Sequence, residues 1–283
     1  MLMKRIIIIC AAAVLVLAIA GYGVFLSLHK PADGMSSAEA DMSEQTAATA
    51  PDTAAQQPAA AQATELDAAL RQAAELKRFT FVTFHQGNDA AGAQMITEVK
   101  SAVESKLSSR AIFVSVDASE PVNRGVLSRY GADRSPLPLT LVIAANGAVT
   151  AGYPQQIPSA VKDSGFAEAL AAPGMADVLK ALQNGSLVAV CFQNAKTKFN
   201  AESRAAADGL KALQQFAGKV EVVVIDPANP DEAMLLKVCS VDVAMSSAQL
   251  VVIAPPGSIA GRFDGAVTTE AVAQSLAQPR GRS

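Results

Sequence analysis

Three cysteines and two histidines are the side chains in this sequence best suited to nucleophilic, redox or metal chemistry. Cys191 and Cys239 are 48 positions apart, and two such thiols could form a disulfide or a thiol–disulfide redox pair. Cys191 also lies within the apolar run 187–192, and a free cysteine commonly behaves as a small buried hydrophobic residue. The sequence leaves a disulfide, a redox pair and two buried thiols open, and it favours the buried thiols.

His85 opens a polar stretch that ends at Asp89, and an imidazole beside a carboxylate can carry a proton or bind a metal ion. The other histidine, His29, lies far upstream, so the region expected to fold offers no second imidazole. We therefore expect His85 to be a polar loop side chain, and we predict no metal site and no bound cofactor. Patterns typical of phosphate-binding loops, serine nucleophiles and zinc proteases do not occur in the sequence.

The charge balance argues against a nucleic-acid partner. The chain has 23 Lys and Arg residues against 26 Asp and Glu residues, which gives a formal net charge of −3. Proteins that bind nucleic acid by charge need a basic surface. With 283 residues, of which 51% are hydrophobic, the chain is long enough for one or two domains with their own cores.

A run of 23 uncharged and mostly apolar residues, 6–28, is long enough to cross a bilayer as a helix. Lys4 and Arg5 precede this run. The positive-inside rule therefore places residues 1–5 in the cytoplasm and the folded part on the exported, periplasmic side of the inner membrane. The small residues at 18–20 also match a signal-peptide cleavage site, which is the alternative to an uncleaved anchor. The sequence favours the anchor because the apolar run continues beyond that site.

Residues 29–64 differ sharply in composition and are predicted to be a disordered linker rich in Ala, Pro and Gln. Twelve of the 34 residues at 31–64 are Ala, and no Leu, Ile, Val or aromatic residue occurs among them. Such a segment cannot bury enough apolar surface to offset its chain entropy. We expect it to tether the folded region to the membrane segment.

The remaining sequence contains two copies of one pattern, at 65–172 and 174–279. In each copy an apolar run ends in an aspartate, Asp117 or Asp226, that is followed by a proline four positions later. This repeated placement favours a turn-forming role for both carboxylates over a catalytic role.

Hydrophobic periodicity predicts the same order of elements in both copies. The first copy is expected to contain a helix that opens at Thr64, a strand at 79–85, a helix at 91–108, a strand at 111–116, a short helix at 123–130, strands at 139–144 and 148–153, and a last helix at 166–172. The second copy is expected to contain a helix at 175–182, a strand at 187–192, a helix at 202–216, a strand at 220–225, a helix at 232–238, strands at 250–254 and 258–263, and a last helix at 271–279.

This order of elements resembles that of the thioredoxin fold, an α/β fold with a mixed central sheet flanked by helices. In the first copy, Gln94-Met95-Ile96 resembles the helix start that follows the redox motif of thioredoxins. The resemblance therefore places Ala90 to Ala93 where that family carries Cys-x-x-Cys. Leu137 and Pro138 resemble the segment that holds the cis-proline of the family.

Neither copy carries a cysteine at the position of the redox motif. In the second copy the corresponding positions are about 197–200, and Ala248 lies near the proline position. Thiol–disulfide exchange needs one thiolate to attack and a second thiol to resolve the mixed disulfide, so the oxidoreductase activity of the family is not expected. The resemblance instead implies a peptide-binding groove, whose residues in the first copy would be Leu137, Pro138, Ala90 and Ala93.

These observations predict a membrane-anchored pair of redox-inactive thioredoxin-like domains that binds a protein or peptide partner as a chaperone-like or scaffold-like assembly module. A binding protein is favoured over an enzyme. The alternatives are an envelope thiol–disulfide oxidoreductase that uses Cys191 and Cys239, and a structural subunit of a membrane complex.

Overall fold

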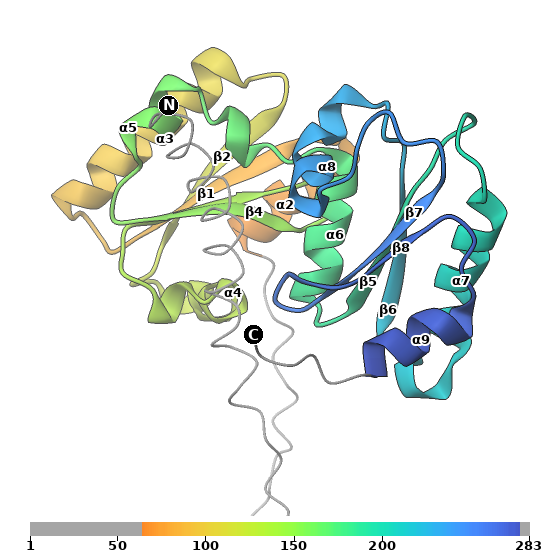
Figure 1. Cartoon of the computed structure of the whole chain (residues 1–283). Coiled ribbons are helices and arrows are strands. Elements are labelled where there is room, and N and C mark those ends of the chain that lie inside the picture. The colour runs from red at the N-terminus through yellow and green to blue at the C-terminus, as the bar shows by residue number, and fades with distance from the viewer. Residues whose placement is uncertain (1–63, 278–283) are drawn as a thin grey trace, which may run out of the picture.

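The computed structural model describes residues 64–277, which form two α/β domains in tandem (Figure 1). The predicted membrane segment at 6–28, and all of the predicted linker at 29–64 except Thr64, lie outside the described residues. None of the described helices is both long enough and apolar enough to cross a membrane.

The first domain is built on a four-stranded mixed sheet. Its strands are β1 (Phe79–His85), β2 (Ala111–Asp117), β3 (Leu139–Ile143) and β4 (Val149–Pro154). They lie in the order β2-β1-β3-β4, with β1 and β2 parallel and the other two pairs antiparallel. Its helices are α2 (Glu65–Glu75), α3 (Ala90–Lys106), α4 (Arg124–Tyr130) and α5 (Ser159–Asp163).

The second domain repeats this topology. Its strands are β5 (Leu187–Phe192), β6 (Val220–Ile225), β7 (Gln249–Ala254) and β8 (Ser258–Asp264), in the order β6-β5-β7-β8. Its helices are α6 (Pro173–Gln183), α7 (Asn200–Ala212), α8 (Ala233–Cys239) and α9 (Thr269–Ala277). Because β5 and β6 are parallel and the other two pairs antiparallel, both halves have the thioredoxin-like arrangement that the sequence predicted. Short 3-10 helices lie at Pro121–Asn123, Ala132–Arg134, Ala167–Ala169, Gln214–Phe216 and Pro230–Glu232.

Helices cover both faces of each sheet because the central strands are apolar on both faces. On β1, Phe81 packs in a cluster with α3 residues, and its neighbour Val82 packs in a cluster with Leu66 of α2. On β5, Val190 packs with α6 and α8, and its neighbour Ala189 packs with α7 and α9. Each domain therefore has a three-layer arrangement of helices, sheet and helices.

The last helix predicted for the first domain, at 166–172, is wrong. α5 ends before this range, which contains only the 3-10 helix Ala167–Ala169. Gly165 and Phe166 both adopt a left-handed conformation with φ of 62°, which a right-handed helix cannot contain. The buried ring of Phe166 instead packs edge-to-face against Phe81, with ring centroids 5.2 Å apart.

The turn between β3 and β4 docks onto α6 and joins the two domains. Asn146 Nδ2 in this turn donates a hydrogen bond to Asp177 Oδ1 (2.8 Å). The amide of Val149 donates to Gln183 Oε1 (3.0 Å), and Gln183 Nε2 donates to the carbonyl oxygen of Val149 (2.7 Å). Ala148 is fully buried in the same apolar cluster as the α6 side chains. Helix α6 therefore lies between the second sheet and the first domain, as Figure 1 shows.

Candidate functional site

The predicted site residues of the first domain gather at one end of its sheet. The register pairs Phe84 with Leu139. Continuing that register by one position places His85 opposite Pro138. The Leu137–Pro138 peptide bond is cis, as the resemblance to thioredoxins implied. Pro138 is buried and Leu137 is half-buried, so Leu137 is the more accessible residue of this proline loop.

Asp117 organises the loop that follows β1. Its Oδ1 accepts hydrogen bonds from the Ser119 hydroxyl (2.7 Å), the Ser119 amide (2.8 Å) and the Gly87 amide (3.0 Å). These hydrogen bonds, that from the Ser119 hydroxyl most of all, lower the pKa of Asp117 to about 2. His85 Nδ1 donates to the carbonyl oxygen of Gly87 (2.9 Å), because a carbonyl can only accept. The turn-forming role predicted for Asp117 is confirmed. His85 is the last residue of β1 and not a loop residue as predicted, although its side chain bonds to the loop that follows.

The first turn of α3 contains Ala90 to Ala93, the positions at which the resemblance to thioredoxins implies the redox motif would lie. Asp89 caps this helix by accepting a hydrogen bond from the Gly92 amide, so its carboxylate serves the helix end. Gly92 lies tightly against β1, because an added Cβ there would be 2.9 Å from His85 Cβ. Ala90 and Ala93 are exposed on this turn. Within residues 64–277 there is no group of three or more His, Cys, Asp or Glu side chains that could hold a metal ion.

The proline loop and the first turn of α3 are not bonded to each other. In the described part of the chain, no hydrogen bond joins residues 86–93 to residues 135–138, and the amide of Leu137 has no acceptor. Pro136 and Pro138 have no amide hydrogen, so Leu137 carries the backbone donor of this tripeptide. An extended peptide can pair with an unpaired backbone group of this kind.

In the second domain the corresponding loops are bonded to each other. The amide of Lys198 donates to the carbonyl oxygen of Ser246 (3.0 Å), and the amide of Ala248 donates to that of Lys198 (2.8 Å). Lys198 and Ser247 thereby form a parallel bridge. Ala248 stands where the first domain has Pro138, and it supplies the N–H that a proline lacks. The second domain thus fills this position with its own backbone.

A polar network also fixes the loop before α7. The Thr197 hydroxyl donates to Asn200 Oδ1 (2.6 Å), and Asn200 Nδ2 donates to the carbonyl oxygen of Asn194 (2.7 Å). Asn194 Nδ2 donates to Asp226 Oδ1 (2.9 Å), and this bond is the main cause that lowers the pKa of Asp226. Asp226 also accepts from the Ala228 amide (2.9 Å), which confirms its predicted turn-forming role. These polar side chains are bonded to one another and to the loop backbone. The loop before α7 therefore offers few free polar groups to a peptide.

Cys191 and Cys239 are both buried free thiols, which is the alternative that the sequence favoured over a disulfide between them. Cys191 lies on β5 in the cluster beneath α7, whereas Cys239 lies at the end of α8 in the cluster beneath α6. These clusters occupy opposite faces of the sheet, which therefore separates the two sulfur atoms. Burial raises the pKa of each thiol to about 11, so neither is a ready nucleophile at neutral pH.

In a Cys10→Ser variant of the full chain, the two remaining thiols are expected not to react with an aromatic disulfide reagent at pH 7. The thiolate is the reacting species, and with a pKa of about 11 roughly one thiol in ten thousand is ionised at that pH. The measurement is the absorbance of the released aromatic thiol, and both cysteines should react once guanidinium unfolds the protein. Rapid reaction of the native variant would show an accessible thiol and contradict this burial.

The comparisons with known proteins find similar folds at low sequence identity. No protein-family model and no curated protein matches the sequence. The chain is similar to the NTD_N/C domain of the alkylhydroperoxide reductase AhpF of Enterococcus faecalis, with 17% identity over 75% of this chain and 99% of that one, at a TM-score of 0.24. It is also similar to the first two thioredoxin domains of Saccharomyces cerevisiae Eps1p (10% identity, 72% and 93% of the two chains, TM-score 0.26). For human ERp44 the identity is 11% over 73% of this chain and 52% of that one, at a TM-score of 0.32.

Sequence reasoning missed the residues that distinguish the two domains. The hydrogen bonds between Lys198 and the loop before β7 were not predicted. The available signal was Ala248, which at the proline position supplies a backbone N–H that a proline would lack. Glu232 was also missed. It is only 4% exposed, and its carboxylate accepts hydrogen bonds from the amides of Gly174 (2.7 Å) and Met175 (3.2 Å) at the start of α6. The sequence carries no local signal for this contact, because its partners are more than fifty positions away.

Proposed function

We propose that this protein is a redox-inactive binding and assembly module, and that its first domain binds extended peptide segments beside Leu137 and the first turn of α3. The observation that supports this most directly is the contrast between the domains. Within the described residues the Leu137 amide of the first domain has no partner, whereas in the second domain Lys198 bonds to the backbone at the corresponding place. At the face formed by the proline loop and the first turn of the following helix, we therefore assign peptide binding to the first domain and not to the second.

The side chains around this face suit binding better than thiol chemistry. Ala90 and Ala93 offer exposed methyl groups on the first turn of α3, and Leu137 in the proline loop is half-buried. An extended segment could pair its backbone with Leu137 and place an apolar side chain over this turn. The buried cysteines on opposite faces of the second sheet count against the alternative of an envelope oxidoreductase.

We also propose that the two domains are presented at the exported face of a membrane. The support is the apolar run at 6–28 with Lys4 and Arg5 before it, together with the Ala-rich stretch up to residue 63. These residues lie outside the described part of the chain. An anchor and a tether of this kind would hold a binding domain near partners at the membrane surface, either as a free module or as a subunit of a larger complex.

Replacing Ala93 with arginine is expected to weaken binding of an unfolded client at least tenfold, or about 1.4 kcal/mol. Ala93 is exposed on α3, and arginine is a good helix former, so the change adds bulk and charge to the proposed face without disturbing the fold. The client is a fluorescently labelled, carboxymethylated protein that cannot refold. The measurement is the anisotropy of this client titrated with the full-length protein.

The matched control is the same change in the closed domain, Ala201→Arg, which lies exposed on the first turn of α7. It is expected to leave the affinity within twofold of that of the unmodified protein. If Ala201→Arg weakens binding as much as Ala93→Arg, or if neither variant changes it, the proposed site in the first domain is wrong.

A further inference from the structure

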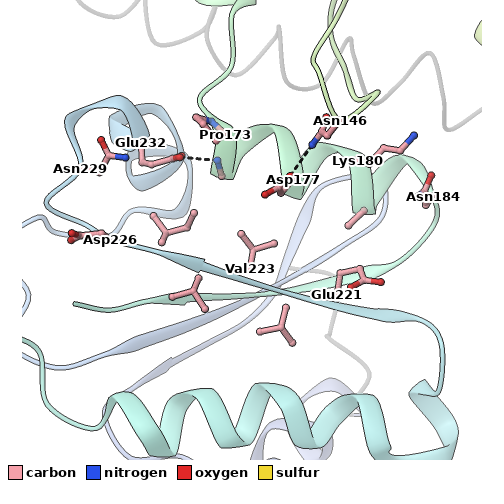
Figure 2. A pocket seen from close by; sticks show the side chains of 15 residues that line it. Asn146, Pro173, Asp177, Lys180, Asn184, Glu221, Val223, Asp226, Asn229 and Glu232 are labelled. Atoms are coloured by element: carbon pink, nitrogen blue, oxygen red, sulfur yellow. Dashed lines mark hydrogen bonds between the residues drawn. The ribbon is translucent and has the colours of Figure 1, made fainter. Parts of the chain in front are cut away.

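A hollow of about 590 Å³ runs along strand β6, between this strand and helix α6 (Figure 2). It lies in the second domain, away from the proline loop of the first. The residues of β6 from Glu221 to Ile225 line it on one side, and Asp177 and Lys180 of α6 line it on the other. Figure 2 shows Asp177 pointing from α6 toward the hollow and Val223 pointing from β6 toward α6.

The free edge of β6 borders this hollow. Among the strands of residues 64–277, β6 is the outermost strand of its sheet and pairs only with β5. The amide of Leu187 donates to the carbonyl oxygen of Lys219 (2.7 Å), and the amide of Gln193 donates to that of Ile225 (2.9 Å). In a parallel ladder the alternate residues between these two face away from the partner strand. The amide and carbonyl groups of Val222 and Val224 therefore point outward from the sheet.

Apart from the charge of Glu221, this edge has few of the features that usually protect an edge strand. Its sequence, Val-Glu-Val-Val-Val-Ile, contains no proline and no lysine. The pairing of β5 with β6 runs without a bulge. Val224 is 43% exposed, and Val222 and Val223 are half-buried. An exposed, regular and apolar edge of this kind readily accepts a further strand.

The charges around the hollow indicate which strand would fit. Four lining side chains are carboxylates, and Lys180 is the lining cation. The side-chain donors to Asp177 and Asp226 are the neutral amides of Asn146 and Asn194. The Asn194 hydrogen bond lowers the pKa of Asp226 most, and the charge of nearby Lys196 also lowers it. The four lining carboxylates still outnumber the one lining lysine. Pairing with β6 of a second copy would bring such acids together and is disfavoured. A segment with basic residues at its ends complements them.

We propose that β6 binds an extended, β-branched peptide segment with basic flanking residues, which adds to the sheet as a fifth strand. The outward amide and carbonyl groups of Val222 and Val224 would pair with its backbone. Its basic side chains would lie near Asp177 and Asp226. This inference concerns the second domain and does not depend on the binding proposed for the first.

The probe is a synthetic heptapeptide, Lys-Val-Thr-Val-Thr-Val-Lys, with blocked ends and a fluorescent label. The full chain carrying Ala93→Arg is titrated with it, so that the face proposed in the first domain is obstructed. The decisive variant adds Val224→Pro, which removes an outward N–H. Proline is tolerated on an edge strand where its nitrogen faces solvent. We expect Val224→Pro to weaken binding at least tenfold and Val224→Thr, the matched control that keeps the N–H, to change it less than twofold.

Two further measurements test the role of the acidic side chains. Neither of them requires the proline variant to fold. Asp177→Asn keeps the acceptor for Asn146 and should weaken binding about threefold, and a peptide with glutamate at both ends should bind at least tenfold more weakly. Equal affinity for Val224→Pro and Val224→Thr, equal affinity for the two peptides, or no binding of either would overturn the proposal. Self-association of the protein that Val224→Pro abolishes would show a second copy on this edge and would also overturn it.

Discussion

Replacing Gly174 with alanine is expected to lower the free energy of unfolding by at least about 3 kcal/mol. Gly174 is the second residue of α6, where a Cβ would collide with Ile225 Cδ1 and lie 2.8 Å from Glu232 Oε1. The collision would strain the core. It would also displace the buried Glu232 carboxylate, which accepts hydrogen bonds from the amides of Gly174 and Met175. Hydrogen bonds to a charged group contribute about 1.5–3 kcal/mol each, so their loss adds to the cost of overpacking.

The measurement for Gly174→Ala is guanidinium unfolding followed by circular dichroism. The matched control is Gly125→Ala in α4, where an added Cβ would have no neighbour within 4 Å. This control should be neutral or stabilise the protein by up to about 1 kcal/mol, since alanine favours helix more than glycine does. Equal stability of the Gly174→Ala variant and the unmodified protein would contradict the packing of α6 against β6 and Glu232.

Replacing Ala148 with glutamate is expected to cost roughly 3–5 kcal/mol and to separate the unfolding of the two domains into distinct transitions. Ala148 is fully buried in the cluster that joins the β3–β4 turn to α6. A carboxylate placed there would be buried without a partner. The turn would have to leave α6, and the bonds between Gln183 and Val149 would break with it. Calorimetry of the full chain reports both the lost stability and the number of transitions.

The corresponding position of the second domain supplies the control for Ala148→Glu. The registers pair Ile143 with Val149 and Ile253 with Ile259, so Ser258 is the counterpart of Ala148. Ser258 is exposed, and Ser258→Glu should change stability by less than about 0.5 kcal/mol. A cooperative single transition with unchanged midpoint in the Ala148→Glu variant would show that the domains are not coupled through this turn.

Much of the fold could be predicted from sequence because hydrophobic periodicity and turn residues are local signals. The central strands, the helix that opens at Thr64 and the duplicated order of the strands follow from such signals and are confirmed. The last helix of the first domain failed because the left-handed backbone of Phe166 is imposed by burial of its ring against Phe81, a contact between distant residues.

The candidate site was predictable only in part for the same reason. Counting from Gln94-Met95-Ile96 placed Ala90 and Ala93 at the start of α3, and the cis peptide at Pro138 agrees with the resemblance. In the second domain, Lys198 pairs with Ser247 at the equivalent place. This pairing joins segments about fifty positions apart, so no local pattern predicts it. The free edge of β6 likewise depends on strand order, which no single segment encodes.

Hydrogen–deuterium exchange of the full chain, with and without the unfolded client, tests the central claim most directly. The account predicts that the client slows exchange at residues 86–93 and at the amide of Leu137, while exchange at residues 197–203 and 245–248 stays unchanged. Slower exchange confined to the second domain's loops, or no change in either domain under conditions where the client is bound, would contradict it.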